Sequence, residues 1–155
     1  APIQYAAITA FEGSEAIDDY LAQCRRLLSA LGEHCVEILR ASGLQVHDPE
    51  GGFYLLLDLR PLAEPLAARG ITTGAQVADR LLEETGVALL PGEDFNRPEG
   101  KLSLRMAYVA FDGAAALAAC EALPPDAPLD TAFLERTCGP TLDGVRRIRD
   151  WLSSP

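Results

Sequence analysis

The sequence predicts one α+β domain, in which helices pack a small, mostly antiparallel sheet and one long helix lies near the N-terminus. Three observations predict this class. Apolar residues at helical spacing alternate along the chain with three short apolar runs that are typical of strands. Apolar residues make up 48% of the 155 residues, enough for one sizeable core. A chain of this length buries roughly 70% of its unfolded surface, as single domains do.

The first part of the chain is predicted to be helical. A short apolar helix runs from Pro2 to Phe11, and Gly13 closes it. Ser14 can cap a second, long helix that continues to Gly43. A helix this long in so small a domain is expected to border something larger than the domain itself. Its apolar residues form one stripe, made of Ile17, Leu21, Cys24, Leu28, Leu31, Cys35, Ile38 and Leu39.

The middle of the chain combines strands with a third helix. After a turn at 47–52, the apolar run from Phe53 to Leu59 predicts a buried strand. Pro61 and Pro65 prevent its continuation. An amphipathic helix is predicted over 71–85 and ends at Gly86, and short strands are predicted over 87–90 and 102–111. The inward residues of this helix are expected to be Val77, Leu81 and Leu82.

The C-terminal part is predicted to be helical again. Asp112 and Gly113 turn the chain into an alanine-rich helix over 114–123. The proline-bearing stretch 123–130 is typical of a linker, and two short helices follow it. The last of these carries Leu142, Val145, Ile148 and Leu152 at helical spacing.

Composition excludes several classes of function. The net charge of −10 argues against nucleic acid as a partner, because phosphate contacts need clustered Lys and Arg. The sequence has no run of 18 apolar residues, so it does not predict a membrane span. Its N-terminus has no positive n-region typical of a signal peptide, and a cytoplasmic protein is expected. Cys24 and Cys35 lie about 16 Å apart along one helix, too far for a disulfide or a shared metal. With only His34 and His47 besides, no metal site is expected.

The candidate binding residue is Arg105, in the strand predicted over 102–111. Alternation along a strand places Arg105 on the face opposite the bulky apolar side chains. Its neighbours on that face, Ser103 and Ala107, are small and leave room for a ligand. The planar guanidinium makes two parallel hydrogen bonds with a carboxylate, so this pattern favours a small anionic ligand. The alternative is an arginine on the solvated face of an amphipathic strand.

Four segments follow one another along the chain: APIQYAAITAF, GGFYLLLDL, LLEETGVALLPGEDF and GKLSLRMAYV. In this order and at these intervals they resemble the C-terminal small domain of class I and II aminotransferases. Those enzymes have fold type I and use pyridoxal phosphate (PLP). The resemblance covers residues 1 to about 123. Residues 124–155 are longer than the family's usual ending and are expected to be a C-terminal helical extension.

The resemblance implies roles for four residues. Arg105 would bind the α-carboxylate of an amino-acid substrate, and Phe53 and Tyr54 would lie near the substrate side of the cleft. Phe95 would belong to a loop that borders the active site. The helix within residues 1–13 would lead in from the interdomain region. The intact enzyme would be a homodimer that moves an amino group between an amino acid and a 2-oxo acid.

The resemblance also implies what the chain does not hold. The family's Schiff-base lysine and PLP-binding residues lie upstream, in the large domain, which is absent here. Lys101 is the only lysine, and it sits four residues before Arg105, so it cannot take that role. We therefore expect no catalytic residue and no bound PLP in this chain alone, which should be inactive by itself.

Three alternatives to transamination remain. The same fold could serve a PLP-dependent lyase or synthase, whose amino-acid carboxylate would also need Arg105. It could be the aminotransferase-like effector domain of a transcription regulator. It could also be a free-standing module that binds dicarboxylates or amino acids.

Overall fold

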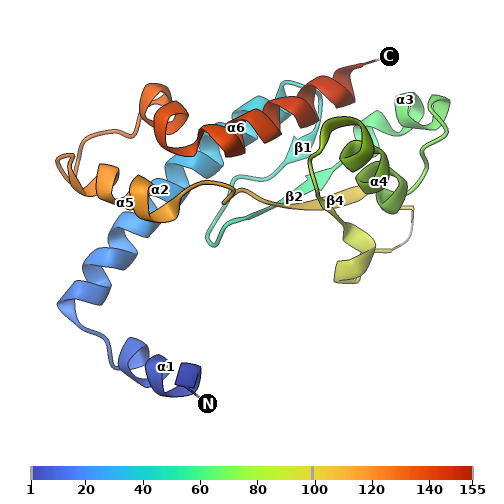
Figure 1. Cartoon of the computed structure of the whole chain (residues 1–155). Coiled ribbons are helices and arrows are strands. Elements are labelled where there is room, and N and C mark those ends of the chain that lie inside the picture. The colour runs from blue at the N-terminus through green and yellow to red at the C-terminus, as the bar shows by residue number, and fades with distance from the viewer. Residues whose placement is uncertain (1, 99, 155) are drawn as a thin grey trace.

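The computed structural model describes residues 2–98 and 100–154. Residues 1, 99 and 155, which belong to the predicted domain 1–155, lie outside the described residues. Figure 1 shows helices packed on a small sheet. The elements in chain order are α1 (Pro2–Glu12), α2 (Glu15–Arg40), β1 (Gln45–Val46), β2 (Tyr54–Asp58), η1 (Arg60–Leu62), α3 (Ala63–Ala68), α4 (Gly74–Thr85), β3 (Leu90–Pro91), η2 (Gly92–Phe95), β4 (Ser103–Ala107), α5 (Gly113–Glu121) and α6 (Thr131–Ser153).

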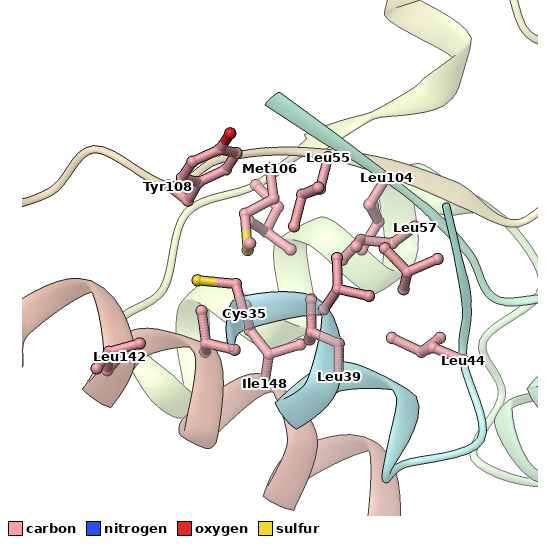
Figure 2. Close-up of a cluster of buried hydrophobic side chains, with 14 of the residues drawn as sticks. Cys35, Leu39, Leu44, Leu55, Leu57, Leu104, Met106, Tyr108, Leu142 and Ile148 are labelled. Carbon is pink, nitrogen blue, oxygen red and sulfur yellow. The ribbon is translucent and has the colours of Figure 1, made fainter. Parts of the chain in front are cut away.

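The sheet has four antiparallel strands in the order β1-β2-β4-β3, which confirms the α+β prediction. Strands β2 and β4 form its centre, with Leu56 opposite Arg105. Figure 2 shows the core between one face of this sheet and the helices α2 and α6. The inward residues of the two central strands are Leu55, Leu57, Leu104 and Met106, all nearly inaccessible.

The long N-terminal helix is confirmed. The Ser14 side chain accepts a hydrogen bond from the Ile17 N–H and so caps α2. The C-terminal half of α2 is buried in the core, whereas its N-terminal half and all of α1 project from the body of the domain (Figure 1). Phe11 of α1 is 93% exposed. The apolar stripe predicted for this helix is therefore buried only where α5, α6 and the sheet meet it.

Several short elements were not predicted. Strand β1 has two residues, too few for any alternation to be visible in the sequence. Helices η1 and α3 form where Pro61 and Pro65 predicted only a break, because proline is tolerated in the first turn of a helix. Strand β3 is also shorter than predicted, since Val87 to Leu89 form no ladder.

The prediction for Leu82 is wrong. Its side chain is 49% exposed, while Val77 and Leu81 are buried as expected. At 100° per residue, Leu82 lies beside the buried stripe of α4 rather than within it. The end of this helix is as expected, since Gly86 adopts a left-handed φ of 74°. Its start is three residues later than predicted, at Gly74, where Thr73 and Gln76 form a capping box that was not predicted.

The C-terminal helix α6 is part of the core. It consists of two helical segments that meet at a kink, where Cys138 has φ −123° and ψ 18° and Pro140 lacks an N–H. The predicted pair of helices is thus confirmed as one bent element, which runs alongside α2 in Figure 1. The end of α6 is tied to α4, because the Trp151 Nε1–H donates to Glu84 Oε2 at 2.7 Å. Its buried apolar residues are Phe133, Leu134, Cys138, Leu142, Val145, Ile148, Trp151 and Leu152.

Candidate functional site

Arg105 lies at the centre of the sheet, on the face turned away from the core. Strand β4 is paired on both sides, so Arg105 has Leu56 of β2 opposite it on one side and Leu90 of β3 on the other. Arg105 and Leu56 are half-buried, and Leu90 is exposed. The prediction that Arg105 points away from the bulky core side chains is confirmed. The ladder on both sides fixes the Cα of Arg105, which suits a residue that must be placed accurately.

Two aromatic rings flank the guanidinium of Arg105. Its Cζ lies 3.7 Å from the ring centroid of Phe95 and 4.4 Å from that of Tyr54. The Phe53 ring in turn lies 4.4 Å from the Tyr54 ring, tilted by 40°. The structure thus brings together all four residues that the sequence suggested, from β2 and the turn before it, η2 and β4. We define these four as the Arg105 cluster.

The Arg105 cluster is open to solvent. Phe53, Tyr54 and Phe95 are 37%, 45% and 39% exposed. Cation–π contacts of partly exposed arginines contribute about 0.5–2 kcal/mol, and they leave the edge of the guanidinium plane free for hydrogen bonds. Among residues 2–98 and 100–154, no carboxylate lies within 4.0 Å of the Arg105 guanidinium. The cluster can therefore take a planar anion, bound by the nitrogens of Arg105 between aromatic walls.

Ser103 does not leave room for a ligand, contrary to the sequence prediction. Its side chain is only 6% exposed, because the backbone of Gly92 lies directly against it. A Cβ added at Gly92 would be 2.1 Å from the Ser103 Oγ. Ala107, the other small neighbour of Arg105, is exposed and does leave space. The free side of Arg105 along its strand is therefore the one toward Ala107.

Beyond Ser103, the same face carries a small basic cavity of about 80 Å³, lined by Leu56, Asp58, Arg60, Arg97, Lys101 and Ser103. Arg60 is already engaged, since its Nε donates to Asp58 Oδ1 at 2.9 Å. That hydrogen bond is the main cause that lowers the pKa of Asp58 below its ordinary value. Lys101 is exposed at the start of β4 and lies in this cavity with two arginines.

Residues 1–123 match the family model described as aminotransferase class I and II. The chain belongs to this family. Aspartate aminotransferase of Bacillus sp. (strain YM-2) is 33% identical over 106 residues, which are 68% of this chain and 25% of that protein. Aspartate/prephenate aminotransferase of Thermus thermophilus is 34% identical over 92 residues, 59% of this chain and 22% of that protein. The chain spans about a quarter of the length of these curated relatives.

Solved structures show the same fold. The aromatic aminotransferase from Pyrococcus horikoshii has a TM-score of 0.64 at 21% identity, over 97% of this chain and 30% of that one. The aspartate aminotransferase from Thermotoga maritima has a TM-score of 0.58 at 24% identity, over 97% of this chain and 28% of that one. At 97% coverage these alignments continue well past residue 123, where the family model stops.

The family is PLP-dependent, and the described residues of this chain do not by themselves fit that cofactor. A Schiff base needs a lysine beside the bound substrate. Lys101, the only lysine, lies with Arg60, Arg97 and the Asp58 carboxylate at the far side of Ser103 from the Arg105 cluster. Within the described ranges, no three His, Cys, Asp or Glu side chains are placed to hold a metal, and no helix could cross a bilayer.

Two groups that shape the Arg105 cluster were missed from the sequence. Leu56 and Leu90 flank Arg105 across the strands, and only the register of the sheet identifies them. Glu93 contacts the start of α4, nineteen positions away in the chain. The only signal in the sequence was the Pro91-Gly92 turn that precedes it.

Proposed function

We propose that this chain is the small domain of a PLP-dependent aminotransferase, 1–155, and that Arg105 binds the substrate α-carboxylate. The enzyme would transfer an amino group between an amino acid and a 2-oxo acid. One observation carries the proposal: in a chain of this family, the half-buried Arg105 lies between two aromatic rings, and no carboxylate of the described residues pairs with it. PLP would be held by the large domain of the same polypeptide, in a homodimer, and would supply the electron sink for the chemistry.

The side chains of this domain bind and orient the substrate. Arg105 would make two charge-assisted hydrogen bonds to the carboxylate, which amino acid and 2-oxo acid share. Phe95 and Tyr54 exclude water from the faces of the guanidinium, which strengthens those bonds. Phe53 supports Tyr54 through their ring contact. Capturing the carboxylate would draw this domain toward the bound cofactor, as the family resemblance implies.

The relatives support transamination over the alternatives. Relatives that match this chain are named aspartate aminotransferase, aspartate/prephenate aminotransferase and asparagine--oxo-acid transaminase. Their names point to aspartate as an amino donor and, for the second relative, to prephenate as a 2-oxo acid acceptor. Arg105 would serve either substrate, because it would contact only the carboxylate beside the amino or oxo group.

The test is Arg105→Ala in the aminotransferase that contains this chain. Charge-assisted hydrogen bonds contribute about 1.5–3 kcal/mol each, so losing the pair should lower kcat/KM about 10²- to 10⁴-fold, mainly through KM for both the amino donor and the 2-oxo acid. Arg105→Lys should recover part of the loss, since lysine keeps the charge but not the fork. Arg149→Ala, which removes a half-buried arginine of α6 paired with Asp150, is the matched control and should leave both KM values unchanged. An unchanged KM for both substrates in Arg105→Ala would refute the proposal.

A further inference from the structure

Glu93 joins the start of α4 to the η2 turn. Its Oε1 accepts a hydrogen bond from the Gly74 N–H at 3.1 Å, at the first residue of α4. Its Oε2 is buried and has no hydrogen-bond partner among the described residues. Buried polar atoms usually have a hydrogen-bond partner, so this carboxylate is held in place despite the desolvation cost of its unpaired oxygen. The positive end of the α4 dipole offsets part of that cost.

Two glycines let three backbones converge around Glu93. A Cβ added at Gly74 would lie 2.6 Å from Glu93 Oε2 and 2.8 Å from the Ser103 carbonyl oxygen. A Cβ at Gly92 would collide with the Ser103 Oγ. The start of α4, the η2 turn and strand β4 are therefore packed backbone to backbone, with the Glu93 carboxylate among them.

Capping of α4 does not need Glu93. Thr73 already caps this helix, since its Oγ1 accepts from the Gln76 N–H and the Gln76 side chain accepts from the Thr73 N–H. The hydrogen bond that Glu93 accepts from the Gly74 N–H therefore serves to fix the position of η2 relative to the start of α4. That turn is closed by the Asn96 and Arg97 N–H groups, which donate to the Glu93 and Gly92 carbonyls.

Phe95 lies two residues after Glu93 in the same turn. Its ring lies 3.7 Å from the Arg105 Cζ, so the position of η2 sets the position of this ring over the guanidinium. We propose that Glu93 is a positioning residue for Arg105: it anchors η2 to α4 and thereby holds Phe95 against the guanidinium. Its effect on substrate affinity rests on the proposed carboxylate-binding role of Arg105.

The first experiment follows the Arg105 Nε–Hε signal by NMR in this chain. Protons above a ring face are shifted upfield, so Phe95→Ala moves the signal downfield. Glu93→Ala is expected to move it in the same direction, whereas Glu93→Gln, which keeps the acceptor for the Gly74 N–H, leaves it near the native position. Thr73→Ala is the matched control: it removes the other contact at the start of α4, so it lowers Tm but leaves the Arg105 signal in place.

The second experiment measures KM and kcat in the aminotransferase that contains this chain. Glu93→Ala and Phe95→Ala should each raise KM for the amino donor about 2- to 30-fold with little change in kcat, as the range of cation–π contributions implies. The double variant should be no worse than the worse single variant, because both changes remove one contact. If Glu93→Ala does not fold, Glu93→Asp, too short to reach Gly74, replaces it in both experiments.

The outcomes separate the two proposals. An unchanged KM in Arg105→Ala would overturn the carboxylate role, while the NMR shift would still test Glu93. A native Arg105 signal in folded Glu93→Ala would overturn the positioning role even if Arg105→Ala weakens substrate binding. Equal displacement of the signal in Thr73→Ala would also overturn it, because any disturbance of α4 would then suffice.

Discussion

Trp151 tests whether the C-terminal helix is an integral part of the domain or an accessory to it. The side chain is only 6% exposed, although it lies within five residues of the C-terminus. Its indole N–H donates to Glu84 of α4, and the Arg69 guanidinium lies 4.1 Å from its ring centroid. Arg69 also donates to the Trp151 carbonyl at 3.1 Å. Trp151→Ala removes the ring, and with it the indole hydrogen bond to Glu84 and the cation–π contact with Arg69, while the backbone carbonyl that accepts from Arg69 remains.

The structure sets the size of the effect. Replacing a buried tryptophan by alanine costs about 3–5 kcal/mol. Glu84 keeps its hydrogen bond from Arg80 at 2.7 Å, so the lost indole contact adds little to that cost. For a domain of this size, each kcal/mol lowers Tm by about 2–4 °C, which predicts a fall of about 6–20 °C. Trp151→Phe keeps most of the buried area and should cost about 1–2 kcal/mol.

The assay is urea denaturation followed by far-UV circular dichroism. Trp151 is the only tryptophan, so fluorescence would lose its probe in the variant. The control is Phe11→Ala, an aromatic truncation at a 93% exposed position of α1, expected within about 0.5 kcal/mol of the native chain. A loss below about 1 kcal/mol in Trp151→Ala would show that the end of α6 unfolds separately from the core, and the account of α6 given above would be wrong.

Two further predictions concern packing and pH. Gly92→Ala should destabilise the chain by about 1–3 kcal/mol, because the new Cβ would collide with the Ser103 Oγ. In thermal melts, adding Ser103→Ala should restore part of the lost stability. Equal melting temperatures for Gly92→Ala and the native chain would contradict the close approach of Gly92 to Ser103. Hydrogen bonds from the Trp151 indole N–H, first, and from Arg80, second, lower the pKa of Glu84 below its ordinary value of 4.5. The ionised Glu84 carboxylate therefore stabilises the fold above pH 4.5, and this stabilisation is lost as the pH falls through the lowered pKa. The difference in stability between the native chain and Glu84→Gln should therefore shrink below about pH 4.5 in urea titrations, and a difference independent of pH would exclude this role of Glu84.

The sequence predicted those features that depend on local rules. Alternation placed Arg105 on the outer face, a capping serine marked the start of α2, and Gly86 marked the end of α4. Each of these features depends only on residues that lie within a few positions of it in the sequence. The family resemblance then singled out Phe53, Tyr54 and Phe95, and the structure places all three in one cluster with Arg105.

Features that depend on tertiary contact were not predictable. The exposure of Leu82 is decided by what packs on α4, and the burial of Ser103 by the approach of Gly92 from another segment. The contact from Glu93 to Gly74 joins two residues whose spacing in the chain carries no periodic signal. A two-residue strand such as β1 forms because β2 offers its edge, and nothing in its own residues requires it.

The two parts of the Arg105 cluster are held in different ways, which suits a site that captures a ligand. Arg105 stands on a strand with ladder hydrogen bonds on both sides, so its backbone is fixed before any ligand arrives. Phe95 stands on a short 3-10 turn that depends on one carboxylate, two glycines and the left-handed Asn96, whose φ is 60°. Two local backbone hydrogen bonds and tertiary contacts, rather than a ladder on both sides, keep that ring in place. Substitutions in η2 should therefore change how Arg105 binds an anion while the β2–β4 ladder stays intact, whereas substitutions in the ladder should disturb both.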